Sequence, residues 1–124
     1  MKLFGALLAL MLAVGAVSFW AWRAAPVSEP CQDVEVVQSH SPDGRAVAEV
    51  YEKRCGDSVS THVALRNTAS PVLSRGDIFI AAGRVPARVL WTSDREAVVE
   101  SPAKHVLVEE SSWHNIGVRV RLVR

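Results

Sequence analysis

The sequence predicts an all-β fold, either an antiparallel meander or two packed blade-like sheets, preceded by an N-terminal membrane helix. Three observations favour it. Residues 3–22 form an unbroken run of apolar or small side chains, with Ser18 as its one polar member. The rest of the chain holds short runs rich in Val, Ile and Leu between Gly, Pro, Ser, Asn and Asp, and none has a sustained helical period. We therefore expect a signal anchor or signal peptide (1–23), a linker (24–30) and an exported β domain (31–124).

The N-terminal apolar run is long enough to cross a membrane as a helix. At about 1.5 Å per residue it spans a hydrocarbon core of about 30 Å. Trp20 and Trp22 beside Arg23 match the aromatic and basic residues of a membrane interface. Residues 16–18 (AVS) form an alternative, a signal-peptide cleavage site. We favour a retained anchor because the apolar run continues past that site, and both possibilities stay open.

The charges that flank the run predict its orientation. Lys2 and the amino terminus precede it and Arg23 alone follows it, so the positive-inside rule favours a cytoplasmic N-terminus and an exported C-terminal domain. We therefore expect a single-pass protein of the inner or cytoplasmic membrane. Without Lys2 and Arg23 the 14 basic residues become 12, against 13 acidic ones. This near-neutral balance gives no indication of a nucleic-acid partner.

The chain has two cysteines, Cys31 and Cys55, and both lie in the part expected to be exported. An isolated pair in an oxidising compartment is most simply a disulfide. A redox pair or a metal site would need a CxxC motif or a histidine at ligand spacing, and neither accompanies them. Closing this loop would stabilise the domain by about 3 kcal/mol in the chain-entropy model.

The exported domain is expected to contain eight strands. The first turn signal is SPDG at 41–44, where Pro42 presets φ, Asp43 bonds its own backbone and Gly44 takes a positive φ. The expected strands are 33–38, 45–53, 61–66, 77–81, 87–91, 96–100, 105–109 and 116–123.

The last strand and the longest connection have distinct patterns. Residues 117–123 (GVRVRLV) alternate, so the two valines and Leu122 should face a core while the two arginines face outward. We interpret the arginine face as a solvated one. Residues 67–76 (NTASPVLSRG) form the one long connection, and long loops are where binding residues concentrate. This loop carries no chemical signature of its own.

A weak internal repeat links two parts of the domain. Residues 43–49 (DGRAVAE) align with residues 94–100 (DREAVVE), each a turn residue followed by an apolar run that ends in Glu. The period of about fifty residues is typical of propeller blades, and SPDG before a strand resembles the blade turn of TolB-type propellers. Two units cannot close a propeller ring. A pair of packed blade-like sheets or one long meander remains.

Several landmarks follow one another along the exported domain: Cys31, SPDGRAVAEVYEKRCG (41–56), THVAL (61–65), GDIFIAAG (76–83) and VLWTSDREAVVE (89–100). Their order resembles a family of small bacterial exported or membrane-anchored proteins of unknown function. The resemblance covers nearly the whole exported domain. It implies an apolar N-terminal segment followed by one β domain, and it implies no activity.

The sequence offers little catalytic chemistry. It contains no GxSxG or SxxK motif, no glycine-rich phosphate loop and no nucleic-acid motif. His62 and His105 lie on expected strands and could meet across a sheet as metal ligands, but no HxH or HxxxH spacing supports this. Trp91 and Trp113 together could form a platform for sugars or peptides, but we expect Trp91 in the core and Trp113 in the SSWHN loop. We predict no catalytic, cofactor or metal residues.

These observations predict a non-enzymatic, membrane-anchored envelope protein. Its periplasmic or extracellular β domain would contact another protein or an envelope component. The alternative is a cleaved, soluble periplasmic inhibitor or immunity-type protein, in which a loop plugs the cleft of an enzyme. The sequence does not indicate an oligomeric state.

Overall fold

The computed structural model of the chain describes residues 30–124. The expected membrane segment and its interface residues Trp20, Trp22 and Arg23 lie outside the described residues. Within residues 30–124 no helix is long and apolar enough to cross a membrane.

The first sheet has five antiparallel strands in the spatial order β1-β2-β3-β4-β7. Its strands are β1 (Gln32–His40), β2 (Ala46–Cys55), β3 (Ser58–Asn67), β4 (Gly76–Ala82) and β7 (Val106–Glu109). The first four strands follow one another along the chain, so they form the meander that the sequence predicts. A bulge between Val34 and Val37 interrupts the edge strand β1, and Glu35 in it has φ of 55°.

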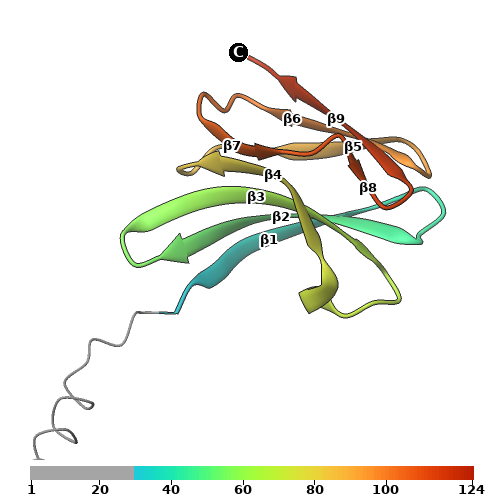
Figure 1. Ribbon diagram of the computed structural model, residues 1–124, viewed down its shortest axis with the longest axis horizontal. Helices are drawn as coiled ribbons and strands as arrows, with labels where there is room; N and C mark the ends of the chain where they lie inside the picture. The colour runs from blue at the N-terminus through green and yellow to red at the C-terminus, as the bar shows by residue number, and fades with distance from the viewer. Residues whose placement is uncertain (1–29) are drawn as a thin grey trace, which may run out of the picture.

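The second sheet has four strands in the order β5-β6-β9-β8 and packs on the first (Figure 1). Its strands are β5 (Arg88–Ser93), β6 (Glu96–Ser101), β9 (Ile116–Leu122) and β8 (Ser112–Trp113). Strands β6 and β9 pair in parallel. The domain is therefore all-β and consists of two packed sheets, as the second predicted arrangement has it, but the parallel β6–β9 pair means that the second sheet is not a simple meander.

The parallel pair has a simple topological cause. After β6 the chain leaves the second sheet, adds β7 to the edge of the first sheet beside β4, and returns through β8 and β9. All eight expected strands are present, within about three residues at each end. The ninth, β8, holds two residues and is too short to give a periodic signal.

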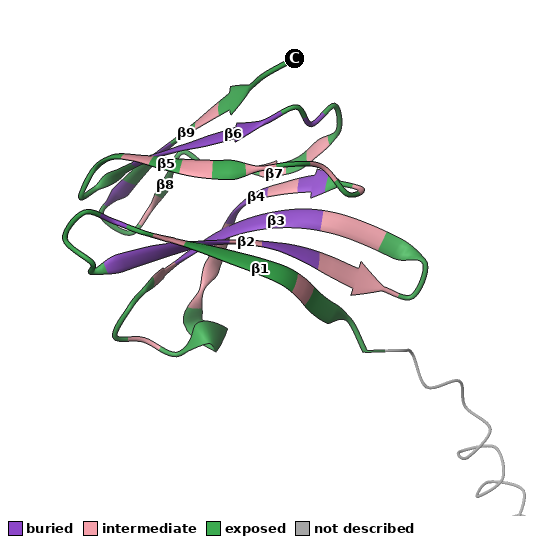
Figure 2. Cartoon of the chain, turned by 180° about the vertical axis from the view of Figure 1, so that it is seen from behind, coloured by how far each residue is buried: buried purple, intermediate pink, exposed green. Residues whose placement is uncertain are grey.

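The core lies between the two sheets and is built by period-two alternation (Figure 2). Phe79 on β4 is fully buried, and Trp91 packs beside the core while its Nε1 donates to the carbonyl oxygen of Ser39 at 3.1 Å. The fully or largely enclosed members from both sheets include Ala48, Val63, Leu65, Ile78, Val99, Ile116 and Val118.

The expectation for the last strand is correct at its start and wrong at its end. Val118 is buried and Val120 packs against the core, whereas Leu122 is 54% exposed. The end of β9 rises away from the first sheet toward the C-terminus (Figure 1). Leu122 therefore has no opposing layer to pack against.

Cys31 and Cys55 form the expected disulfide. It joins the residue before β1 to the last residue of β2, where the antiparallel register places the two strand ends side by side. The bond thus closes the end of the β1–β2 hairpin that is opposite its turn.

The long connection between β3 and β4 folds back over the outer face of the first sheet (Figure 1). It contains one 3-10 turn, η1 (Val72–Ser74). Val47, Glu49 and Ala64 point away from the second sheet, yet each is at most 1% exposed. Their burial follows because this connection covers them.

Candidate functional site

Four segments converge at one end of the sandwich and enclose a cleft of about 430 Å³. They are the β1–β2 turn, the β5–β6 turn, the β8–β9 turn and the connection between β3 and β4. Loops that a rigid sandwich holds in place are common positions for binding residues. We call this feature the end cleft. Its charged and aromatic lining residues are Asp43, Arg45, Asp94, Arg95, Trp113 and His114.

The two turns of the internal repeat lie on opposite walls of the end cleft. The first is SPDG, where the Gly44 amide donates to the Ser41 carbonyl oxygen at 2.9 Å and Gly44 has φ of 72°. Pro42 and Asp43 occupy its centre, as the sequence predicts. The second turn, Asp94–Arg95, leads into β6 as the first leads into β2. The repeat therefore places a DGR turn and a DR turn, one from each sheet, around one cavity.

Asp43 acts first as a turn residue. Its Oδ1 accepts hydrogen bonds from the Ser41 hydroxyl at 2.7 Å and the Arg45 amide at 3.1 Å. These hydrogen bonds hold the pKa of Asp43 below its ordinary value of 3.8. The carboxylate thus stays charged at the rim of the cleft while it orders the turn.

Trp113 and His114 form the third wall. The two rings meet edge to face with centroids 4.2 Å apart. The indole packs so tightly on Gly76 that a Cβ there would lie 2.3 Å from Trp113 Nε1. His114 has φ of 50°, a left-handed conformation that costs a residue with a side chain about 1 kcal/mol or more. The sandwich therefore holds this aromatic pair in a defined place.

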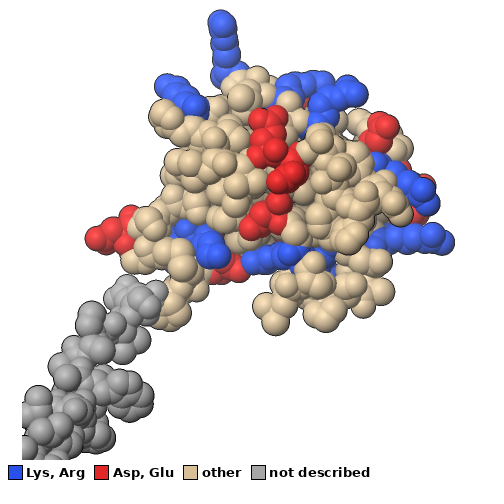
Figure 3. Space-filling model, viewed as in Figure 1, with Lys and Arg blue, Asp and Glu red and all other residues tan. Residues whose placement is uncertain are grey.

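The end cleft carries charged side chains of both signs, and these could contact a ligand. Among residues 30–124, Arg45 and Arg95 form no salt bridge, although six other arginines do. With Asp43 and Asp94 nearby, the cleft offers cations, anions and an aromatic surface together. Figure 3 likewise shows basic and acidic side chains interspersed over one face of the molecule. Such a lining suits a polar ligand or a protein surface that carries both donors and acceptors.

A second cluster lies on the outer face of the first sheet. The Ser60 Oγ is 2.7 Å from His62 Nε2, and His62 Nδ1 is 3.3 Å from Asp77 Oδ2. The Tyr51 hydroxyl donates to Asp77 Oδ1 at 2.7 Å, and the Tyr51 ring stacks on His62 with centroids 5.0 Å apart. Burial and the Asp77 carboxylate raise the pKa of Tyr51. No local sequence motif reveals this cluster, because its members are separated along the chain.

The connectivity of Ser60, His62 and Asp77 is that of a hydrolytic triad, but its setting differs from one. Ser60 lies on the central strand β3 between Lys53 of β2 and Ala82 of β4, so its backbone amide belongs to the sheet. Ser60 therefore does not sit on a turn whose free backbone amides would form an oxyanion site, as the nucleophile of a hydrolase does. The cluster does not line the end cleft, nor does it line the hollow on the outer face of the second sheet that is described below. We interpret it as a buried polar network that rigidifies the sheet.

The contacts of His62 also disfavour metal binding by this residue. Both ring nitrogens of His62 are engaged, one by Ser60 and one by Asp77. His105 is exposed, just before β7. No group of three or more potential metal-ligating side chains occurs within the described part of the chain.

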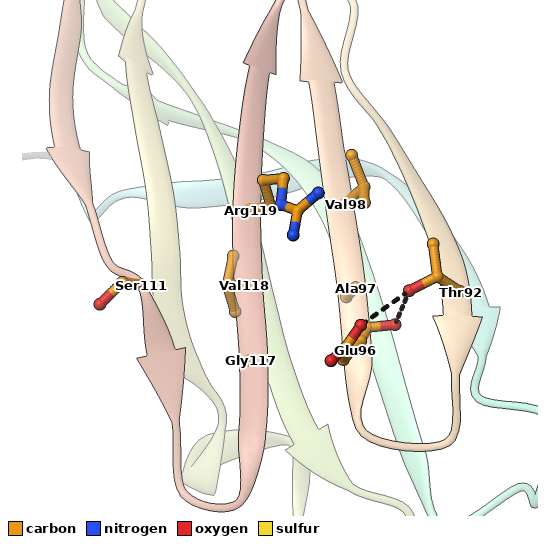
Figure 4. Close-up of a pocket in the computed structure, with 8 residues that line it drawn as sticks. All are labelled: Thr92, Glu96, Ala97, Val98, Ser111, Gly117, Val118 and Arg119. Atoms are coloured by element: carbon orange, nitrogen blue, oxygen red, sulfur yellow. Dashed lines mark hydrogen bonds between the residues drawn. The ribbon is translucent and has the colours of Figure 1, made fainter.

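The outer face of the second sheet carries an open hollow of about 310 Å³ (Figure 4). Its floor is made by β6 and β9, with Val98 and Val118 among the lining residues. The Thr92 hydroxyl lies 3.5 Å from Glu96 Oε2, so two of its polar groups already face each other. The hollow presents fewer convergent polar groups than the end cleft, and we take the end cleft as the candidate site.

Comparison with known proteins finds no matching family model, no similar curated protein and no similar solved structure.

The sequence identified part of the candidate site. It predicted the Pro42–Gly44 turn and noted Trp113 as an aromatic platform, and both line or border the end cleft. It did not place Arg95 and His114 beside them. The signal available in the sequence was the repeat itself, because two equivalent turns before two central strands lie at the same end when two sheets pack.

Proposed function

We propose that the chain is a non-enzymatic, membrane-anchored envelope protein whose exported β sandwich contacts another protein or an envelope component through the end cleft. The observation that carries this proposal is the convergence of four segments around a cavity with unpaired arginines and a fixed aromatic pair. Membrane attachment rests on the apolar run at 3–22 and its flanking charges.

The site favours recognition over catalysis. Its charged side chains are two arginines and two turn-forming aspartates rather than a nucleophile aligned with a base. The Ser60 cluster has that alignment but lies within a continuous sheet. Binding through turns at the end of a β sandwich needs no cofactor, and we propose none.

A position-specific crosslink tests the proposal. A photo-crosslinking amino acid at Asn115, in the β8–β9 turn, should capture a defined adduct in intact envelopes. The same group at Leu107, which is 63% exposed and outside the cleft, is the matched control. Arg95→Glu should abolish the Asn115 adduct. Identical adducts at both positions, or none at Asn115, would contradict a role for the cleft.

A cleaved inhibitor or immunity-type protein is the second candidate. It is favoured by the AVS sequence at 16–18 and by the same projecting turns, which could enter the cleft of an enzyme. Cell fractionation with N-terminal sequencing separates the two. A mature chain that begins at Phe19 in the soluble fraction supports the inhibitor, whereas full-length chain in membranes supports the anchored protein.

A further inference from the structure

The connection between β3 and β4 ends in an exposed apolar tip. Leu73 is 98% exposed and Val72 is 49% exposed, and both belong to η1. One exposed leucine on a protein surface is ordinary. This pair differs because of how it is held and which way it points.

The tip is fixed by ion pairs at its base. Arg75 follows η1 directly, and its Nη1 donates to Glu49 Oε2 at 3.0 Å. Arg75 also pairs with Asp33 and covers the Tyr51 ring, with its guanidinium carbon 3.9 Å from the ring centroid. The Ser74 hydroxyl closes the turn on the Pro71 carbonyl oxygen at 2.6 Å. These contacts therefore hold the two exposed apolar side chains in a defined position.

The tip and the start of the domain lie on the same side of the sandwich. Figures 1 and 2, seen from opposite sides, both place η1 and the beginning of β1 on the side away from the second sheet. The C-terminus lies on the opposite side in both views.

The short linker before Cys31 keeps this side of the sandwich close to the expected membrane segment. Only residues 24–30 separate the expected membrane segment from Cys31. Seven residues reach at most about 25 Å when fully extended. An anchored domain is thus confined close to the bilayer, with the start of β1 nearest to it. Two more residues of this face suit the contact: Val36 is 47% exposed, and Lys53 forms no salt bridge among residues 30–124.

We propose that Val72 and Leu73 insert into the interface of the membrane that holds the anchor. The inference rests on the proposed anchoring and adds a second lipid contact, which would orient the sandwich with the outer face of the first sheet toward the bilayer. Apolar side chains at such a contact enter the boundary between headgroups and acyl chains.

Spin labels on the full chain in lipid nanodiscs test the proposal. Because Cys31 and Cys55 are bonded to each other, Leu73→Cys supplies a single reactive thiol. Leu90→Cys is the matched control, since Leu90 is 42% exposed on the outer face of the second sheet. The label at 73 should lose most of its accessibility to a water-soluble nickel relaxant and keep its accessibility to oxygen. The label at 90 should remain open to nickel.

The possible outcomes separate the two proposals. Absence of the chain from the nanodisc fraction would refute the anchor and with it this inference. A nanodisc-bound chain whose label at 73 is as open to nickel as the label at 90 would refute the lipid contact alone. A label at 73 shielded from both nickel and oxygen would mean that a second copy of the chain covers the tip, which would also overturn the lipid contact.

A second variant tests the bracing. Arg75→Gln, combined with the label at 73, should increase the mobility of the label and restore its accessibility to nickel. An unchanged spectrum and an unchanged depth would show that the ion pairs do not position the tip.

Discussion

Each sheet carries a glutamate that pairs with two arginines, but the two sheets shield these ion pairs from water to different extents. Glu49 on β2 and Glu100 on β6 occupy equivalent positions of the internal repeat, and each lies between two arginines on an outer face. Glu49 pairs with Arg66 and Arg75, whose side chains are 13% and 16% exposed. Glu100 pairs with Arg88 and Arg121, whose side chains are 69% and 62% exposed.

The difference arises from one connection. The segment between β3 and β4 folds over Glu49 and supplies Arg75, whereas nothing comparable covers Glu100. An ion pair in water contributes little to stability, while breaking a buried one leaves an uncompensated charge. The glutamate–arginine pairs thus hold the β3–β4 connection in place on the first sheet. On the second sheet the arginines of the equivalent pairs remain in contact with solvent.

The largest expected effect concerns the bond that only the first sheet possesses. Cys55→Ser should lower the free energy of unfolding by about 3 kcal/mol or more, because the unfolded chain regains the entropy of the open loop. Urea unfolding of the oxidised protein measures it. The protein should also change its electrophoretic mobility on reduction. Free thiols at Cys31 and Cys55 in protein purified without reductant would contradict the disulfide.

The comparison of the two glutamates gives the next effect. Glu49→Gln should destabilise the domain by about 3 kcal/mol, because Arg66 is left buried without its partner. Glu100→Gln, the matched control, should cost less than about 1 kcal/mol because its arginines are solvated. Urea midpoints at neutral pH measure both. Equal losses would show that the covering connection does not distinguish the two sites.

Two glycines provide a smaller contrast. Gly76→Ala should destabilise by about 2 kcal/mol and displace Trp113, because the new Cβ would lie 2.3 Å from the indole. Gly117→Ala is the control, since its nearest neighbours lie at 3.9 Å, an ordinary contact. Near-ultraviolet circular dichroism should change for the first variant alone. A native Trp113 signal in Gly76→Ala would mean that the wall of the end cleft formed by Trp113 and His114 adapts easily to the added methyl group.

The smallest expected effect is the pH dependence that Glu49 confers. Burial pushes the pKa of Glu49 upward, but the hydrogen bonds from Arg66 and Arg75 outweigh it and leave the pKa below its ordinary value of 4.5. Its contribution is therefore complete above the unfolded pKa and is lost as the pH falls through the lower folded pKa. Unfolding curves between about pH 6 and pH 3 should show a shallower acid decline for Glu49→Gln than for the parent chain. Parallel declines would remove Glu49 from the acid response.

Local sequence pattern predicted the strands well because each signal lies within a few residues. The SPDG turn and the alternation of 117–123 are of this kind, and both have the expected geometry over most of their length. The parallel pairing of β6 with β9 depends on where β7 docks, which is a long-range choice that no short pattern records.

The candidate site was less predictable for the same physical reason. Arg95 and His114 become neighbours of Asp43 only when two sheets pack, and the loop at 67–76 shows no periodicity that would reveal its fold over Glu49. Nor does the repeat reveal which of its two buried glutamates has arginine partners that are shielded from water. That property belongs to the covering connection rather than to the strands that carry the repeat.

The position of the disulfide has a mechanical consequence. In an anchored chain, any pull from the membrane enters the domain at Cys31, one residue before the edge strand β1. Without the bond, such a force would open the β1–β2 ladder one hydrogen bond at a time. With it, the load passes covalently to Cys55 and into β2, which is paired on both sides. In an anchored chain, the disulfide would therefore let the domain keep its shape under tension applied at its N-terminus.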